Sequence, residues 1–256
     1  MLGLGHAAGH FGVMDLPFPL PRVAAVFGAS GGIGAALVAE LRARGVERVH
    51  AGARSEVAAQ HGVVPFRFDL LDEDSIAYAA ASMAPDPPEL VLIATGVLSL
   101  PGGAGPEKSW RSLDPAVMAQ VLALNTIGPA MIARHMLPLL PRNRRAVLAA
   151  LSARVGSIGD NRLGGWHSYR ASKAALNMLL KNLALELTRT HPQAVVAALH
   201  PGTVDTPLSA PFQGNVAPGK LFDAARCAGH LVDVVQQLGP DRSGGFYAWD
   251  GAQIAW

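Results

Sequence analysis

The stretch that most constrains the fold is "GASGGIG", which runs from Gly28 to Gly34. An apolar run, "VAAVF" at 23–27, comes directly before it, and a segment with helical spacing follows at 33–44 and ends at Gly45. A buried strand, a glycine turn and a helix in this order predict one βα unit. Glycines let the backbone approach a ligand closely, and a helix N-terminus offers free N–H groups to a pyrophosphate. The residues expected to hold a dinucleotide here are Gly28, Ser30, Gly32, Ile33 and Gly34.

The glycine spacing is G-x-x-x-G-x-G rather than G-x-G-x-x-G. Taken alone, it also fits a tight strand–helix turn that binds nothing. The flanking strand and helix favour the dinucleotide interpretation, because they place the turn where a cofactor phosphate meets a helix N-terminus.

The rest of the chain repeats the alternation of apolar strand and amphipathic helix. Apolar strands separated by helices pair in parallel, with both sheet faces covered, and the crossovers are right-handed. We therefore expect one α/β domain over residues 22–256, a doubly wound parallel sheet (Rossmann fold) in a three-layer αβα sandwich. After the first βα unit, strands are expected at 48–54, 63–70, 89–96, 145–152, 194–202 and 244–251, and helices at 72–83, 115–140, 169–190 and 223–238.

Composition narrows the class of protein further. Half of the 256 residues are apolar and 16% are charged, which suits a buried core. A formal charge of +2 suggests neither a nucleic-acid nor a membrane partner, and no run of 18 apolar residues predicts a membrane span. Cys227 is the single cysteine, so no intrachain disulfide forms. That fits a reducing compartment, and we expect a cytoplasmic protein.

The first 21 residues are expected to form a loosely ordered extension. They lack the basic start and continuous apolar core of a signal peptide. His6 and His10 are four apart, but no cysteine or acidic ligands accompany them, so no metal site is expected.

The end of the second expected strand bears on cofactor choice. In dinucleotide folds an acid about 20 residues beyond the glycine turn binds the ribose 2′-hydroxyl, whereas an arginine accommodates a 2′-phosphate. Counting from Gly34 leads to Ala53 and Arg54, so an arginine is present and an acid is not. This favours NADP(H), with NAD(H) as the alternative. A solvated strand-end residue is the other interpretation of Arg54.

The stretch "YRASK" places Tyr169 and Lys173 four residues apart in an expected helix, on one face. A free phenol has a pKa of about 10, and a nearby ammonium together with a positive nicotinamide ring favours the phenolate. Such a phenol can give a proton to a carbonyl oxygen or take one from an alcohol. Hydride then moves between the cofactor and that carbon. The pair predicts an oxidoreductase when it is combined with the glycine turn.

These motifs together resemble the short-chain dehydrogenase/reductase family over about residues 22–256. The matching pieces are "GASGGIG", "IATG", the asparagine of "LALNTIG", "YRASK" and "HPGTVDT". The stretches "SARVGSIGDN", "GGWHSYRASKAALN", "HPGTVDTPLSAPF" and "AWDGAQIAW" also resemble the C-factor/sniffer subgroup of carbonyl reductases.

The resemblance implies a role for each matching residue. Tyr169 is the proton donor or acceptor, and Lys173 lowers its pKa and holds the nicotinamide ribose. Asn125 holds a water that links Lys173 to solvent. The family also implies a homodimer or homotetramer. The resemblance also implies that Asp69 approaches the adenine and that Gly96 keeps the backbone close to the adenosine ribose. The segment with Gly202, Val204 and Thr206 is implied to run beside the nicotinamide and its phosphate.

The serine that polarises the carbonyl in this family is the point of departure. Its usual position, thirteen residues before the tyrosine, holds Gly156, and the Ser-Ser pair of the subgroup lines up with Ser152 and Ala153. Ser152 or Ser157 could take over the role, and we favour Ser152. The absent serine also motivates a second hypothesis, a cofactor-binding signalling or regulatory protein with little turnover.

The substrate side is expected to be framed by mixed residues, which suit an uncharged small-molecule carbonyl or alcohol. We expect the Leu208–Lys220 loop, rich in Pro and Gly, to be a lid over this site. The framing residues are the 97–105 loop, Arg154, Trp166, His167 and the 203–220 segment.

Overall fold

Seven strands form a single parallel sheet in the computed structural model, which describes residues 17–100, 105–215 and 219–256. Their order is β3-β2-β1-β4-β5-β6-β9, and each neighbouring pair is parallel. The expected doubly wound sheet is therefore confirmed. The strands are β1 (Val23–Phe27), β2 (Arg48–Ala53), β3 (Val63–Arg67), β4 (Leu90–Ile93), β5 (Ala146–Leu151), β6 (Ala194–His200) and β9 (Gly245–Ala248).

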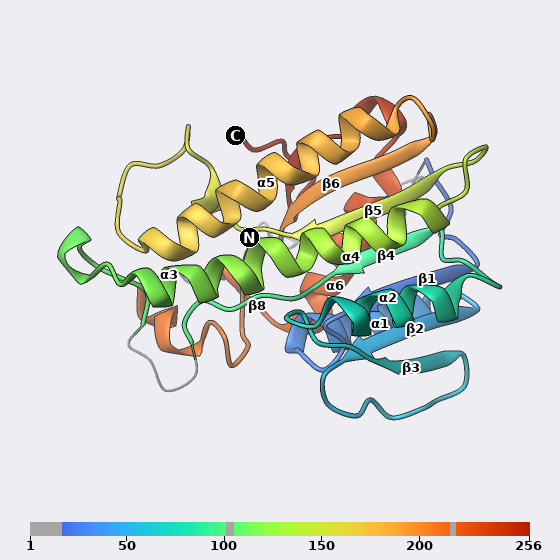
Figure 1. The fold of residues 1–256 in the computed structure, drawn as a ribbon, viewed down its shortest axis with the longest axis horizontal. Coiled ribbons are helices and arrows are strands. Elements are labelled where there is room, and N and C mark those ends of the chain that lie inside the picture. Colours follow the sequence, from blue (N-terminus) through green and yellow to red (C-terminus); the bar gives the residue numbers. More distant parts are fainter. Residues whose placement is uncertain (1–16, 101–104, 216–218) are drawn as a thin grey trace, which may run out of the picture.

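Helices cover both faces of this sheet and complete three layers (Figure 1). One face packs against α1 and α6, and the opposite face packs against α2, α4 and α5. Each face of the sheet has its own apolar core, because successive strand residues point to opposite faces. The helices are α1 (Gly32–Ala43), α2 (Glu73–Met83), α3 (Pro115–Leu122), α4 (Gly128–Met136), α5 (His167–Leu187) and α6 (Ala224–Gln237).

Helices α2 and α3 begin at aspartate caps. The carboxylate of Asp72 accepts the N–H groups of Asp74 and Ser75, and Asp114 does the same for Ala116 and Val117. Such caps satisfy donors that the first helical turn leaves free, so these helices start where the sequence predicts.

The long helix expected at 115–140 is continuous but irregular. A π-helical turn at Ala123–Ile127 separates α3 from α4, and a 3-10 turn at Leu137–Leu139 ends the run. By length and composition the run Pro115–Leu139 could cross a membrane. Its apolar face is accounted for by the core, where Ile132 and Met136 are fully buried against the sheet.

Residues 17–21 of the expected N-terminal extension are packed rather than loose. Phe18 exchanges two hydrogen bonds with Gln236 on α6, at 3.2 and 3.1 Å, and the Arg145 guanidinium lies 4.5 Å from its ring centre. The remaining extension residues, including His6 and His10, lie outside the described residues.

A small second sheet was not expected. It pairs β7 (Thr203–Val204) with β8 (Leu221–Phe222), beside the carboxyl end of β6. The order of strands reverses between β1 and β4, and ligands of doubly wound sheets bind outside the carboxyl ends of the strands at such a point. The remaining short 3-10 turns are Trp110–Ser112, Arg154–Gly156, Ala210–Asn215 and Pro240–Arg242.

Candidate active site

The glycine turn after β1 is built so tightly that only glycine fits at two positions. Gly28 has φ of +99°, and a Cβ there would lie 2.8 Å from the Ala94 carbonyl oxygen. A Cβ on Gly34 would lie 2.0 Å from the Gly28 carbonyl oxygen. The residue that precedes helix α1 is Gly31, which provides no side-chain cap. Its first N–H groups therefore have no side-chain partner at this position, which suits a pyrophosphate.

A second loop closes over the start of α1. A Cβ on Gly32 would lie 2.8 Å from Thr206 Cγ2, so the turn after β1 touches the segment after β6. Ile33, Gly202, Val204 and Thr206 line one pocket. Ser30 is exposed and lies outside that lining. The structure therefore brings four of the expected cofactor residues together in one pocket with Tyr169 and Ser152.

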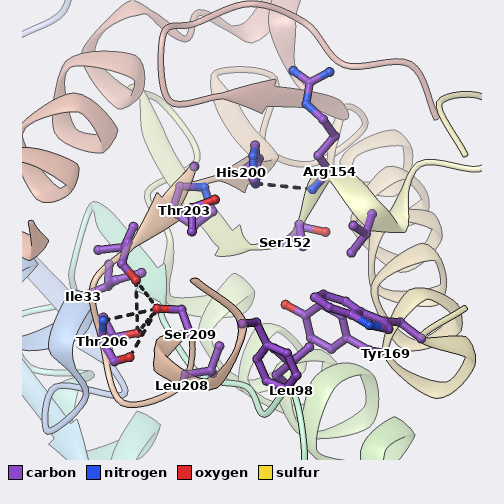
Figure 2. Close-up of a pocket in the computed structure, with 17 residues that line it drawn as sticks. Ile33, Leu98, Ser152, Arg154, Tyr169, His200, Thr203, Thr206, Leu208 and Ser209 are labelled. Atoms are coloured by element: carbon purple, nitrogen blue, oxygen red, sulfur yellow. Dashed lines mark hydrogen bonds between the residues drawn. The ribbon is translucent and has the colours of Figure 1, made fainter. Parts of the chain in front are cut away.

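That pocket has a volume of about 230 Å³ and opens beyond the carboxyl ends of β5 and β6. Figure 2 shows Tyr169 and Ser152 toward one end of it, and Ile33 and Thr206 toward the other. Arg154 belongs to the rim, as expected, whereas His167 is absent from the lining. Much of the wall is apolar and comes from Leu98, Val155, Trp166, Leu208 and Phe212.

Helix α5 delivers the tyrosine from its first turn. The helix begins after Trp166. The backbone of Trp166 has a φ of 51°, the left-handed conformation that residues other than glycine rarely adopt. The Trp166 ring packs edge-on against Phe212, with ring centres 5.3 Å apart. The turn that starts the helix therefore also forms a wall of the pocket.

A buried carboxylate caps α5 from a different part of the chain. Glu107 Oε2 accepts the Ser168 N–H at 3.1 Å, and Oε1 accepts the Ser168 hydroxyl. Its backbone carbonyl accepts the Trp166 N–H. Burial, the largest single effect, raises the pKa of Glu107, but the bonds from Ser168, a bond from its own backbone and the nearby His167 together lower it by more, so the pKa is lowered overall. Sequence reasoning missed Glu107, because its partner lies 61 residues away.

The pKa values of Tyr169 and Lys173 are strongly shifted by burial. Burial raises the pKa of Tyr169 to about 12 and lowers the pKa of Lys173 to about 8. Lys173 Nζ donates to the Leu151 carbonyl oxygen at 2.9 Å. In the structure, burial therefore outweighs the expected lowering of the phenol pKa by the lysine.

Asn125 and Gly96 lie beside the lysine. Gly96 has φ of +148°, and a Cβ there would come within 3.1 Å of Asn125 Oδ1 and 3.2 Å of Lys173 Nζ. The Asn125 amide accepts from Val97 N–H at 2.7 Å and donates to the Val97 carbonyl at 2.8 Å. Asn125 sits within the π-helical turn, a distortion often found at functional sites. Its side chain therefore holds the strand-end backbone beside Lys173.

The two candidate serines differ in position. Ser152 lines the pocket together with Tyr169, and its hydroxyl donates to Asn177 Oδ1 at 2.7 Å. Ser157 is absent from the pocket lining, and its hydroxyl accepts the Asp160 N–H at 3.0 Å. Within the described ranges, neither serine forms a hydrogen bond with the Tyr169 hydroxyl. Position in the pocket favours Ser152.

His200 is a pocket residue that sequence reasoning missed. Its Nδ1 accepts the backbone N–H of Arg154 at 3.3 Å, and burial lowers its pKa to about 4. The imidazole is therefore neutral at pH 7 and joins the end of β6 to the loop after β5. The "HPG" at 200–202 was the available sequence signal.

Two of the residues expected near the adenosine lie at a second cavity of about 640 Å³, whereas Gly96 lies beside Lys173 instead. Arg54, at the end of β2, and Asp69, after β3, both line it. Asp69 Oδ1 accepts the Leu71 N–H at 2.9 Å, whereas Arg54 is exposed. Among the described residues, no ion pair involves Arg54.

A glycine turn that fits a pyrophosphate, together with a tyrosine and lysine on one helix face, defines a nicotinamide-dependent class of protein. The family model described as short chain dehydrogenase matches residues 22–216. The chain belongs to the short-chain dehydrogenase family of oxidoreductases, as its motifs predict.

Two relatives and one solved structure illustrate the similarity. C-signal of Myxococcus xanthus is 34% identical over 157 residues, 60% of this chain and 89% of that protein. The 1-hydroxy-2-glutathionyl-2-methyl-3-butene dehydrogenase of Rhodococcus sp. (strain AD45) is 31% identical over 237 residues, 90% of this chain and 98% of that protein. The NADPH-bound carbonyl reductase from chicken fatty liver has a TM-score of 0.80 and 25% identity, covering 94% of this chain and 97% of that chain.

Proposed function

We propose that the protein is an NADP(H)-dependent oxidoreductase that interconverts a carbonyl and an alcohol of a small molecule. The observation that carries the proposal is the placement of Tyr169, with Lys173 one turn on, in a pocket that also contains Ile33 and Thr206 from the cofactor side. The NADPH-bound carbonyl reductase from chicken supports the cofactor and the reaction by similarity.

Bound NADP(H) supplies or accepts the hydride. Tyr169 keeps its proton at neutral pH, since burial raises its pKa to about 12, and in reduction it donates that proton to the substrate oxygen. Lys173, whose pKa is about 8, is mostly charged at pH 7 and favours the phenolate that remains. We assign Ser152, the candidate serine in the pocket, to donate a hydrogen bond to the same oxygen, which requires its hydroxyl to turn away from Asn177. Trp166 and Phe212 exclude water from one side.

The cofactor's two ends meet different residues. The uncapped start of α1 and the glycines at 28 and 34 fit the pyrophosphate. Lys173 binds the nicotinamide ribose and Gly96 keeps the backbone close to the adenosine ribose, while Arg54 binds a 2′-phosphate at the second cavity beside Asp69. A cytoplasmic location and a homodimer or homotetramer stay predictions from the sequence.

The direct test is NADPH oxidation by the purified protein over a panel of aldehydes and ketones, with Tyr169→Phe as the variant. We expect the variant to lose at least about 10²-fold in rate, because the phenylalanine ring has no proton to give. Tyr247→Phe is the matched control, since its hydroxyl donates to the Arg242 carbonyl and lies outside the pocket.

Two outcomes would overturn the proposal. Unchanged turnover in Tyr169→Phe would remove the tyrosine from the mechanism. Tight NADPH binding without turnover across the whole panel would favour the signalling hypothesis.

A further inference from the structure

The hydroxyl of Ser152 donates its hydrogen to a neighbouring side chain, whereas the proposed reaction needs it to donate to the substrate oxygen. It donates its hydrogen to Asn177 Oδ1 at 2.7 Å, and both side chains are only 3% exposed. A hydroxyl has one hydrogen to donate, so Ser152 then turns only lone pairs toward the pocket. In this state it does not polarise a substrate carbonyl.

The partner amide is itself incompletely bonded. Asn177 Nδ2 is buried and has no hydrogen-bond partner within the described part of the chain. A buried donor without a partner is costly, and orphaned N–H groups are rarer in proteins than under-satisfied carbonyl oxygens. The observed arrangement therefore leaves the more costly half of the amide unsatisfied.

Half a turn of the amide about its last side-chain bond exchanges the two groups. Nδ2 then donates to Ser152 Oγ, and the unsatisfied group becomes Oδ1, the less costly one. The Ser152 hydroxyl loses its acceptor and is released to donate into the pocket. The two amide orientations thus correspond to a serine that only accepts and a serine that donates.

We propose that Asn177 is a positioning residue that sets the direction of the Ser152 hydroxyl. This inference rests on the proposed function. A substrate oxygen in the pocket gains a hydrogen bond only from the donating serine, so its binding adds to the preference for the rotated amide. No covalent step is added, because the amide only reorients.

The helix geometry explains why one element can do this. Tyr169, Lys173 and Asn177 follow one another at intervals of four residues on α5, so they share a face. One face thereby carries the proton donor, the cation that supports it and the amide that directs the serine at the end of β5. Of the three groups, only Tyr169 lines the pocket, and the other two act through Tyr169 and Ser152.

The test uses two substitutions with opposite hydrogen-bonding consequences. Asn177→Asp places an ionised carboxylate there, favoured by Lys173 one turn away, and it accepts the serine hydrogen permanently. We expect kcat for ketone reduction to fall about 10²-fold, the usual effect of losing one donor to the substrate oxygen. Leucine has no acceptor for the Ser152 hydrogen and no donor to orient its oxygen. We therefore expect Asn177→Leu to lower kcat by about tenfold or less. Met178→Asp, a carboxylate on the exposed neighbouring residue, is the control.

A double-mutant cycle separates direction from mere packing. Each Asn177 variant is combined with Ser152→Ala, and rates are normalised to NADPH-binding sites measured by fluorescence. We expect neither variant to lower the rate further once the serine is gone. The Asn177→Leu arm stands by itself if Asn177→Asp does not fold.

Equal losses in Asn177→Asp and Asn177→Leu, or losses that persist in the Ser152→Ala background, would overturn the inference. Tyr169→Phe measured alongside keeps the proposals distinct. If that variant is inactive while the cycle shows no coupling, only the role of Asn177 fails. If that variant remains active, the proposed function itself fails.

Discussion

The two ends of the proposed cofactor site differ in burial. At the proposed nicotinamide end Ser152, Asn125 and Lys173 are buried, each hydrogen-bonded to a neighbour, and the pKa of Lys173 is lowered by burial. At the proposed adenosine end Arg54 is exposed to solvent and lines a second cavity. Buried charges interact strongly and resist screening by salt, whereas exposed ones do not. The buried end is therefore suited to proton transfer, and the exposed end is suited to discriminating NADP(H) from NAD(H).

Replacing Lys173 tests the buried end and should have the largest effect. We expect Lys173→Met to lower kcat by about 10²-fold or more, because the cation that favours the Tyr169 phenolate is lost. The same substitution should stabilise the apo protein, because burying the ammonium lowers its pKa from 10.5 to about 8. At about 1.4 kcal/mol per pKa unit, burying the charged lysine costs roughly 3 kcal/mol of folding free energy. Losing its hydrogen bond to the Leu151 carbonyl offsets about 1 kcal/mol of the gain from removing it.

The sign of this stability effect depends on pH. Between pH 8 and 10.5 the unfolded lysine binds a proton that the folded one does not, so wild-type stability rises across that window. The gain of about 2 kcal/mol expected for Lys173→Met at pH 7 should therefore vanish by about pH 10. Urea unfolding at both pH values measures it, with Lys181→Met on the same helix as the control. A variant less stable than wild type at pH 7 would contradict the account of the buried end.

The features that the sequence could predict are those that depend on residues close together along the chain. Each βα unit is encoded by neighbours along the chain, so apolar runs such as 23–27 and 194–200 predict their strands to within a few residues. Tyr169 and Lys173 were found because helical spacing is also local. Packing of residues 17–21 against α6 was missed, because an extended Pro-rich segment carries no periodic signal.

The groups that support the buried end were not predictable in this way. The bond of Asn177 to Ser152 joins residues 25 apart, and that of Glu107 to Ser168 joins residues 61 apart. Such contacts depend on tertiary packing, and nothing in local spacing marks them. The competing serines were separable only when the structure placed Ser152 in the pocket and Ser157 outside it.

Replacing Arg54 tests the exposed end and should have an intermediate effect. We expect Arg54→Ala to weaken NADPH binding about tenfold while NADH binding stays unchanged, because only the 2′-phosphate contact is lost. Raising the salt concentration should shrink this difference, since the arginine is solvated. Fluorescence titration of both cofactors at low and high salt measures it, and Arg189→Ala, an exposed arginine beyond the end of α5, is the control. An equal loss for NADH and NADPH would assign Arg54 a role other than phosphate recognition.

Glu107 should give the smallest effect, and it bears on how firmly the buried end is held. Removing a side chain that caps a helix costs about 1–2 kcal/mol, so we expect Glu107→Ala to lower the free energy of unfolding by that amount and kcat by only a few-fold. The net pKa of Glu107 is lowered, so its contribution is present above its ordinary pKa of 4.5 and is lost as the pH falls below it. Glu107→Gln keeps one acceptor and should lie between the alanine variant and wild type. If both variants matched wild type in stability at pH 7, the start of α5 would be held by its packing around Trp166 rather than by this carboxylate.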